Sequence, residues 1–159
     1  MSSFFTQKTF AANSSTCKIE NLGSYVAERA DDGEHQHAYQ FDFWKCDKKL
    51  FGFYYNSMWL VGDPIEPAKR TIFISQIDDS KFNISLLSNE FSGKFADKIV
   101  KVILNKSINM DFYPGASERT KIGQLPIFSD FDSWEKWAKK EVELFNKKYC
   151  QSPNCSTGK

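Results

Sequence analysis

From Tyr39 to Phe112 the chain alternates short runs of aromatic and β-branched residues with polar turns. Within these runs every second residue is apolar, which is typical of antiparallel strands. In the run 36–45, Tyr39, Phe41 and Phe43 share one face. The predicted strands span residues 23–30, 36–45, 50–60, 70–77, 81–87, 98–104 and 107–113, and a further short strand is predicted within 118–128.

Turn residues mark the connections between these strands. Residues 47–49, 78–80 and 105–106 predict tight turns, because Asp, Asn and Ser favour turn conformations. The segment 88–94, which contains Phe91 and Gly93, is interpreted as a polar connection rather than a strand.

A single helix is predicted near the C-terminus. Asp132 is interpreted as its N-cap, with Glu135 three residues later in a capping-box pattern. We expect its apolar face to pack on the sheet, since amphipathic helices mostly dock on their own domain. A helix lying on a membrane surface is the alternative. The predicted apolar face consists of Trp134, Trp137, Ala138, Leu144, Phe145 and Tyr149.

These elements predict a mainly β protein. It is an antiparallel meander of seven to eight strands, a barrel or curled sheet, with one C-terminal amphipathic helix at about 132–149. Closure is favoured because it removes exposed strand edges, and a two-sheet sandwich is the alternative. Residues 1–20 are predicted as a flexible lead-in and 21–159 as a single domain. The outline resembles that of lipocalin-like barrels. The Gly-x-Trp motif of lipocalins is not at its expected place, so the resemblance implies no function.

Composition narrows the classes of function. The net charge is +1 and the isoelectric point about 7.6. Nucleic-acid-binding domains usually carry a basic stripe or an isoelectric point above about 9. No apolar run approaches the roughly 18 residues of a spanning helix. We therefore expect neither a nucleic-acid partner nor a membrane span.

The four cysteines are Cys17, Cys46, Cys150 and Cys155. An even number near the chain ends is typical of periplasmic or secreted domains with disulfides. The favoured connectivity pairs Cys150 with Cys155 and Cys17 with Cys46. A bridge from Cys17 or Cys46 to the C-terminal tail is one alternative, and four reduced thiols in the cytosol are another. The chain opens without the basic and apolar segments of a leader peptide, so a leader would be absent from this sequence.

His35 and His37 are the only histidines. If Gln36 lies on a strand, both imidazoles project to the same face. Glu34 or Asp32 would then be the third ligand of a candidate metal site. A zinc site that adds the C-terminal cysteines is a further alternative, and a polar turn entering a strand explains the same residues without a metal. No cofactor is predicted.

Groups suited to catalysis are few. There is no Gly-x-Ser-x-Gly turn for a nucleophilic serine. Cys46 lies one hairpin strand from His37, but a disulfide explains it better. The aspartate pairs at 31–32 and 78–79 fall in predicted turns, whereas glycoside hydrolysis needs two carboxylates facing each other across a cleft. We predict that the protein is not an enzyme.

The segment 51–60 carries aromatic residues on both faces. A strand with one buried face would not show this pattern. Either the C-terminal helix covers the outer face, or that face is a recognition surface, where Tyr, Trp and Met are enriched. In the second case Tyr55 and Trp59 are the candidate binding residues.

These observations predict a non-enzymatic binding protein of the cell envelope or secreted space. Its partner would be a protein, as for an inhibitor or an immunity protein. A carrier of a small apolar ligand in an aromatic-lined barrel cavity is the first alternative. A metal-dependent enzyme using His35 and His37 is the second. A cavity at the barrel mouth would favour the carrier, and a filled interior would favour the protein-binding role.

Overall fold

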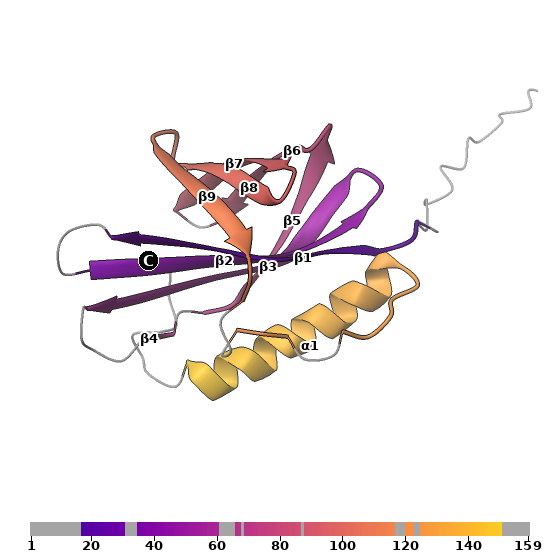
Figure 1. Cartoon of the computed structure of the whole chain (residues 1–159). Coiled ribbons are helices and arrows are strands. Elements are labelled where there is room, and N and C mark those ends of the chain that lie inside the picture. The colour runs from indigo at the N-terminus through magenta and orange to yellow at the C-terminus, as the bar shows by residue number, and fades with distance from the viewer. Residues whose placement is uncertain are drawn as a thin grey trace, which may run out of the picture.

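Eight antiparallel strands close into a barrel, and one helix lies against its outside (Figure 1). This computed structural model describes residues 17–30, 35–60, 66–67, 69–86, 88–116, 120–122 and 125–150. The barrel strands are β1 (Glu20–Ala30), β2 (His35–Cys46), β3 (Lys49–Leu60), β5 (Thr71–Asp78), β6 (Lys81–Leu86), β7 (Asn89–Ala96), β8 (Ile99–Leu104) and β9 (Ile108–Pro114). The short strand β4 (Glu66–Pro67) pairs with β3, and the helix α1 spans Phe131–Tyr149. The predicted meander barrel with a C-terminal helix is confirmed.

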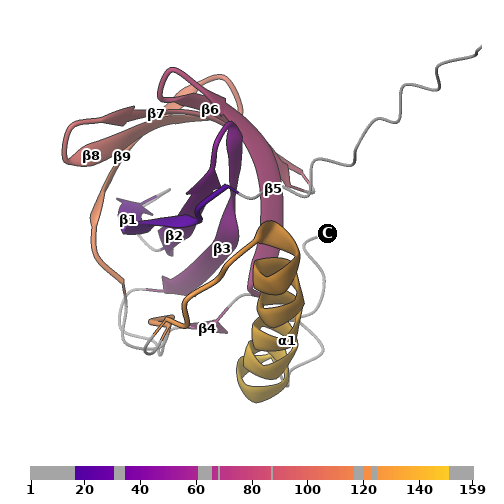
Figure 2. The ribbon, with the colours of Figure 1, turned by 90° about the vertical axis from the view of Figure 1, so that its right-hand side faces the viewer.

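Each barrel strand pairs with the next one along the chain, and β1 pairs with β9 to close the ring. The β2–β3 ladder is long and runs from His35 opposite Leu60 to Cys46 opposite Lys49. The closing β1–β9 ladder is short and joins Tyr25 and Val26 to the end of β9. Figure 2 shows the barrel wall curving from β5 round to β9, with α1 outside it. Closure gives the first and last strands a partner, which removes the exposed edges of an open sheet.

Short turns with left-handed residues connect the later hairpins. Asp79 and Ser80 have φ angles of 46° and 69°, and Asn105 and Lys106 have φ angles of 51° and 66°. Pairs of left-handed residues are typical of type I′ turns, whose twist matches that of the flanking strands. The turns predicted at 78–80 and 105–106 are therefore confirmed.

Aromatic rings fill the barrel interior around Phe41, which is fully buried. Its ring centroid lies 5.1–5.7 Å from five other ring centroids. These rings belong to Phe43, Tyr54, Phe73, Phe91 and Phe112. All eight barrel strands contribute buried residues to the same cluster. The interior at this level is thus a packed core, as in other small barrels.

Strand β7 corrects one prediction, because residues 88–94 were interpreted as a polar connection. The alternation of polar and apolar residues in β7 is interrupted at Gly93, which lies between the inward-facing Phe91 and Phe95. The ring of Phe82, opposite Gly93 in the ladder, takes up the missing volume. A Cβ atom at Gly93 would lie 2.1 Å from Cζ of Phe82. Glycine is needed there, although it weakens the strand pattern.

Two further predictions near the C-terminus are wrong. The described residues 120–122 and 125–128 form no strand. The N-cap of α1 is Asp130 rather than Asp132, because Asp130 has the extended backbone that a cap requires. Its carboxylate accepts the N–H of Ser133 at 2.7 Å, and this lowers the pKa of Asp130. Asp132 lies in the first turn instead.

The helix packs on the outer faces of β2, β3 and β5, as predicted. Trp134, Ala138 and Phe145 are buried there. The ring of Trp137 lies 6.0 Å from that of Trp44 and 5.8 Å from that of Phe53, measured between centroids. Leu144 departs from the predicted apolar face and is 53% exposed. The helix α1 does not combine the length and apolar character needed to cross a bilayer.

The outside of the barrel is therefore divided into two halves. Residues from the segment 122–128 join α1 in covering the half formed by β2, β3 and β5. The outward-facing residues of β6, β7, β8 and β9 are exposed along the centre of each strand. Residues 1–16 of the predicted lead-in lie outside the described residues, while Cys17 and Ile19 pack against the covered half.

Candidate functional site

A disulfide joins Cys17 to Cys46, with 5.6 Å between the two Cα atoms. It ties the segment before β1 to the end of β2 and confirms this predicted pair. Cys150, directly after α1, is also disulfide-bonded. Cys155 lies outside the described residues. The cysteines thus serve as structural bridges, which removes Cys46 as a nucleophile.

The candidate metal site lies only partly within the described structure. His37 is half-buried in β2, and its ring stacks on that of Tyr39 with centroids 6.0 Å apart. Among the described residues no group of three His, Cys, Asp or Glu side chains lies close enough to hold a metal ion. Asp32, Glu34 and the side chain of His35 lie outside those residues, so the metal site stays a prediction.

The candidate binding residues Tyr55 and Trp59 lie on β3. Tyr55 is 5% exposed, and its ring centroid is 5.6 Å from that of Phe145 in α1. The helix therefore covers the outer face of the aromatic segment at this point. Trp59 lies opposite Gln36 in the ladder, and its side chain is outside the described part of the chain. A binding role for either residue stays a prediction.

A buried polar network lies under the covered half of the barrel. The carboxylate of Asp42 accepts hydrogen bonds from the hydroxyl of Ser24 and from Nε2 of Gln40, the latter at 3.0 Å. Thr120 donates to the side-chain oxygen of Gln40, and Nη2 of Arg70 donates to the carbonyl of Thr120 at 2.7 Å. The network thus connects β1 and β2 to Arg70 and to the segment that contains Thr120.

The same network reaches α1, and burial lowers the pKa of Arg70, its cationic member, while the charge of Asp42 opposes this shift. The guanidinium of Arg70 lies 4.0 Å from the ring centroid of Phe145, and the backbone N–H of Arg70 donates to Asn146. Burial raises the pKa of Asp42, although its hydrogen bonds and the charge of Arg70 oppose this shift. A groove of about 450 Å³ adjoins Asp42 and Trp44. The hydrogen bonds of this network hold the Asp42 carboxylate and connect the barrel to α1. We therefore interpret the network as structural.

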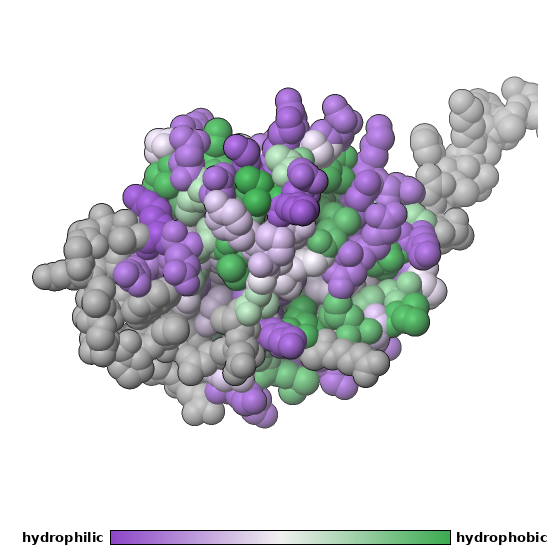
Figure 3. Space-filling model, viewed as in Figure 1, coloured by the Kyte–Doolittle hydropathy of each residue, from purple (hydrophilic) through white to green (hydrophobic). Residues whose placement is uncertain are grey.

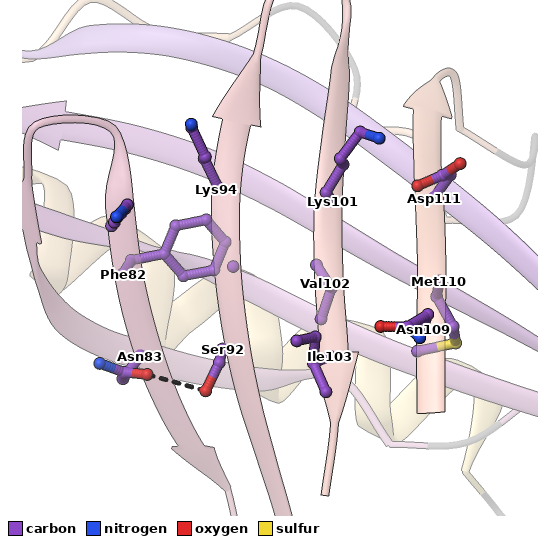
Figure 4. A pocket seen from close by; sticks show the side chains of 12 residues that line it. Phe82, Asn83, Ser92, Lys94, Lys101, Val102, Ile103, Asn109, Met110 and Asp111 are labelled. Carbon is purple, nitrogen blue, oxygen red and sulfur yellow. Dashed lines mark hydrogen bonds between the residues drawn. The ribbon is translucent and has the colours of Figure 1, made fainter. Parts of the chain in front are cut away.

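A second groove, of about 460 Å³, lies on the exposed outer face of β6 to β9 (Figure 4). Three lysines cross it at one level: Lys81 faces Lys94 in the β6–β7 ladder, and Lys94 faces Lys101 in the β7–β8 ladder. We call Lys81, Lys94 and Lys101 the lysine row. Asp78 and Asp111 are the next residues at its two ends. Figure 3 shows hydrophilic side chains projecting from this part of the molecule.

At a second level, next to the lysine row, the groove is lined by three polar residues and one apolar residue. These are Asn83, Ser92, Ile103 and Asn109, which also pair in order across the four strands. The hydroxyl of Ser92 donates to the side-chain oxygen of Asn83 at 2.9 Å. Ile103 is 42% exposed and adds one large apolar side chain to this level. The groove therefore offers cations, amides and one apolar contact together.

Sequence reasoning missed this groove. Each lysine lies on the outward face of its own strand and is unremarkable by itself. Only the ladder register brings the three together, and that register depends on the turn lengths and on recognising β7. Had residues 89–96 been predicted as a strand, Lys94 could have been aligned with Lys81 and Lys101 on neighbouring strands.

Comparisons with protein-family models, with curated proteins and with solved structures find no match to this chain. The geometry of the molecule therefore carries the functional proposal.

Proposed function

We propose that this is a non-enzymatic binding protein that recognises a protein partner through the outside of its barrel. The packed interior is the observation that carries the proposal. At the level of Phe41, described side chains fill the barrel from wall to wall with rings in contact. A carrier would instead need an interior cavity, commonly of about 300–1,000 Å³.

The position of the two described grooves supports the same proposal. One lies beside Asp42 and the other lies over β6 to β9, and both are on the outside of the barrel. The exposed half also presents Ile103 and Tyr113, the latter 57% exposed, among polar residues. Tyrosine in a polar surrounding is a common anchor of protein–protein interfaces.

An inhibitor or immunity protein of an enzyme is the kind of binding protein that we propose. Such proteins bind with little change of backbone, which suits a closed barrel with a docked helix. The Cys17–Cys46 disulfide is compatible with an oxidising compartment, and it supports a proposed location in the periplasm or outside the cell.

Native mass spectrometry of the protein purified from its own host tests this function. The expected result is a stoichiometric complex with a second polypeptide. A small-molecule adduct that is released on unfolding would support the carrier instead. Either that adduct or a bare chain in fresh, low-salt extracts would contradict the proposal.

A further inference from the structure

We propose that the lysine row docks an acidic segment of the partner protein. This inference rests on the proposed function and names the surface and the chemistry of the contact. Lys81, Lys94 and Lys101 lie side by side on three adjacent strands, on the half of the barrel that α1 does not cover.

The charges of the row are not neutralised within the described structure. Like charges directly opposite each other on a sheet repel, and Lys94 faces a lysine on both sides. Asp78 and Asp111 adjoin only the ends of the row. Among the described residues, none of the three ammonium groups has a carboxylate within 4.0 Å, and the ion pair that the structure shows joins Lys139 to Glu135 on α1. The row therefore presents three adjacent ammonium groups, with carboxylates only at its two ends.

The dimensions of the row match an extended acidic segment. Neighbouring strands are about 4.8 Å apart, so the three lysines span about 10 Å. In an extended chain, alternate side chains on one face are about 7 Å apart. Two carboxylates about 7 Å apart therefore fit within the length of the row, and each can reach an ammonium group, where charge-assisted hydrogen bonds are strong.

The second level of the groove favours a polypeptide over a nucleic acid. Asn83 and Asn109 can exchange hydrogen bonds with a peptide backbone, and Ile103 offers an apolar contact. The aromatic residue among the lining residues, Phe82, is 3% exposed and turned inward over Gly93. The described groove thus lacks the exposed ring on which a single-stranded base would stack.

Titration of the oxidised full-length protein with a short polyglutamate peptide tests the docking site. Backbone NMR shifts should change along β6 to β9 and leave α1 unchanged, and binding should weaken strongly in about 1 M salt, where the Debye length is about 3 Å. Lys94→Glu should weaken binding by roughly tenfold, equivalent to about 1.4 kcal/mol. The matched control Lys140→Glu makes the same charge change at an exposed lysine of α1 and should leave binding unchanged.

Three outcomes would overturn the assignment. They are no binding of the peptide at low salt, equal loss in both variants, and tighter binding of single-stranded DNA or inorganic phosphate than of the peptide. An unchanged amide spectrum outside β7 confirms that Lys94→Glu is folded; if it is not, Lys94→Gln serves with the same criterion. A protein partner seen by native mass spectrometry, without peptide binding, would retain the proposed function and reject this site. If the protein binds the peptide but carries a small molecule in its host, the docking site would be retained and the proposed function rejected.

Discussion

Phe41 lies at the centre of the barrel, and its packing decides whether the interior is a core or a cavity. Replacing Phe41 with alanine is expected to lower the free energy of unfolding by about 3–5 kcal/mol, because it removes a fully buried ring among five others. Chemical denaturation measures this change. Ile74→Ala, at a position 51% exposed on β5, should stay within about 0.5 kcal/mol. A loss below about 1 kcal/mol for Phe41→Ala would mean that the interior is not closely packed.

Asp42 makes stability depend on pH. Burial raises its folded-state pKa above the ordinary value of 3.8. The folded protein therefore holds this proton more tightly than the unfolded chain does. The resulting contribution to stability is fully present below the unfolded pKa and is lost as the pH rises through the folded pKa.

Asp42→Asn tests this dependence, since the amide keeps an oxygen for Ser24 and Gln40 and does not titrate. Relative to the natural protein, the variant should gain in free energy of unfolding as the pH rises from about 4 toward neutral. Urea unfolding at a series of pH values measures the difference. A difference that does not change with pH would show that Asp42 titrates alike in both states.

At the scale of single elements, α1 provides a matched pair of neighbouring positions. Phe145 is 7% exposed and packs on Tyr55, whereas Leu144 is 53% exposed. Phe145→Ala should cost about 3–5 kcal/mol of stability, and Leu144→Ala should change it by no more than about 0.5 kcal/mol. Thermal and chemical unfolding compare the two. Equal effects would contradict the docked position of the helix.

Because like charges repel within the lysine row, we expect Lys94→Glu to raise stability while it impairs binding of the acidic peptide. Lys94→Glu places a carboxylate between Lys81 and Lys101, so the free energy of unfolding should rise by roughly 0.2–1 kcal/mol at low salt. Added salt should reduce this gain, because it screens exposed charges. Lys140→Glu should show no comparable gain. If Lys94→Glu destabilises the protein, then Lys94 has a structural role and the repulsion argument fails.

At the scale of the whole molecule, the fold could be predicted because its signals are local. Alternation at Tyr39, Phe41 and Phe43 and the amphipathic pattern of residues 131–149 each need only a few neighbouring residues. Strand β7 was missed where a contact distant in sequence, the ring of Phe82 over Gly93, replaces a local signal. The N-cap was misplaced because two nearby aspartates offer the same chemistry and only the backbone at Asp130 selects one.

The candidate site could not be predicted for a related reason. The lysine row arises from three separate strands, and no spacing in the sequence marks it without the ladder register. The same holds for the buried network, in which Asp42 and Arg70 meet only after β2, the segment around Thr120 and α1 are assembled. The candidate residues taken from local sequence, His37 and Tyr55, lie in the wall of the barrel instead.

The division of the barrel into a covered and an exposed half is the basis of the functional account. Photo-cross-linking in the protein's own host tests this account most directly. It compares a photo-reactive residue at position 103 with one at position 144. Ile103 lies in the groove beside the lysine row, and Leu144 is an exposed apolar residue on α1. The account predicts a cross-link to a second protein from position 103, none from position 144, and loss of the cross-link when Lys94→Glu is added. Cross-linking from position 144 alone, equally from both positions, or from neither would contradict it.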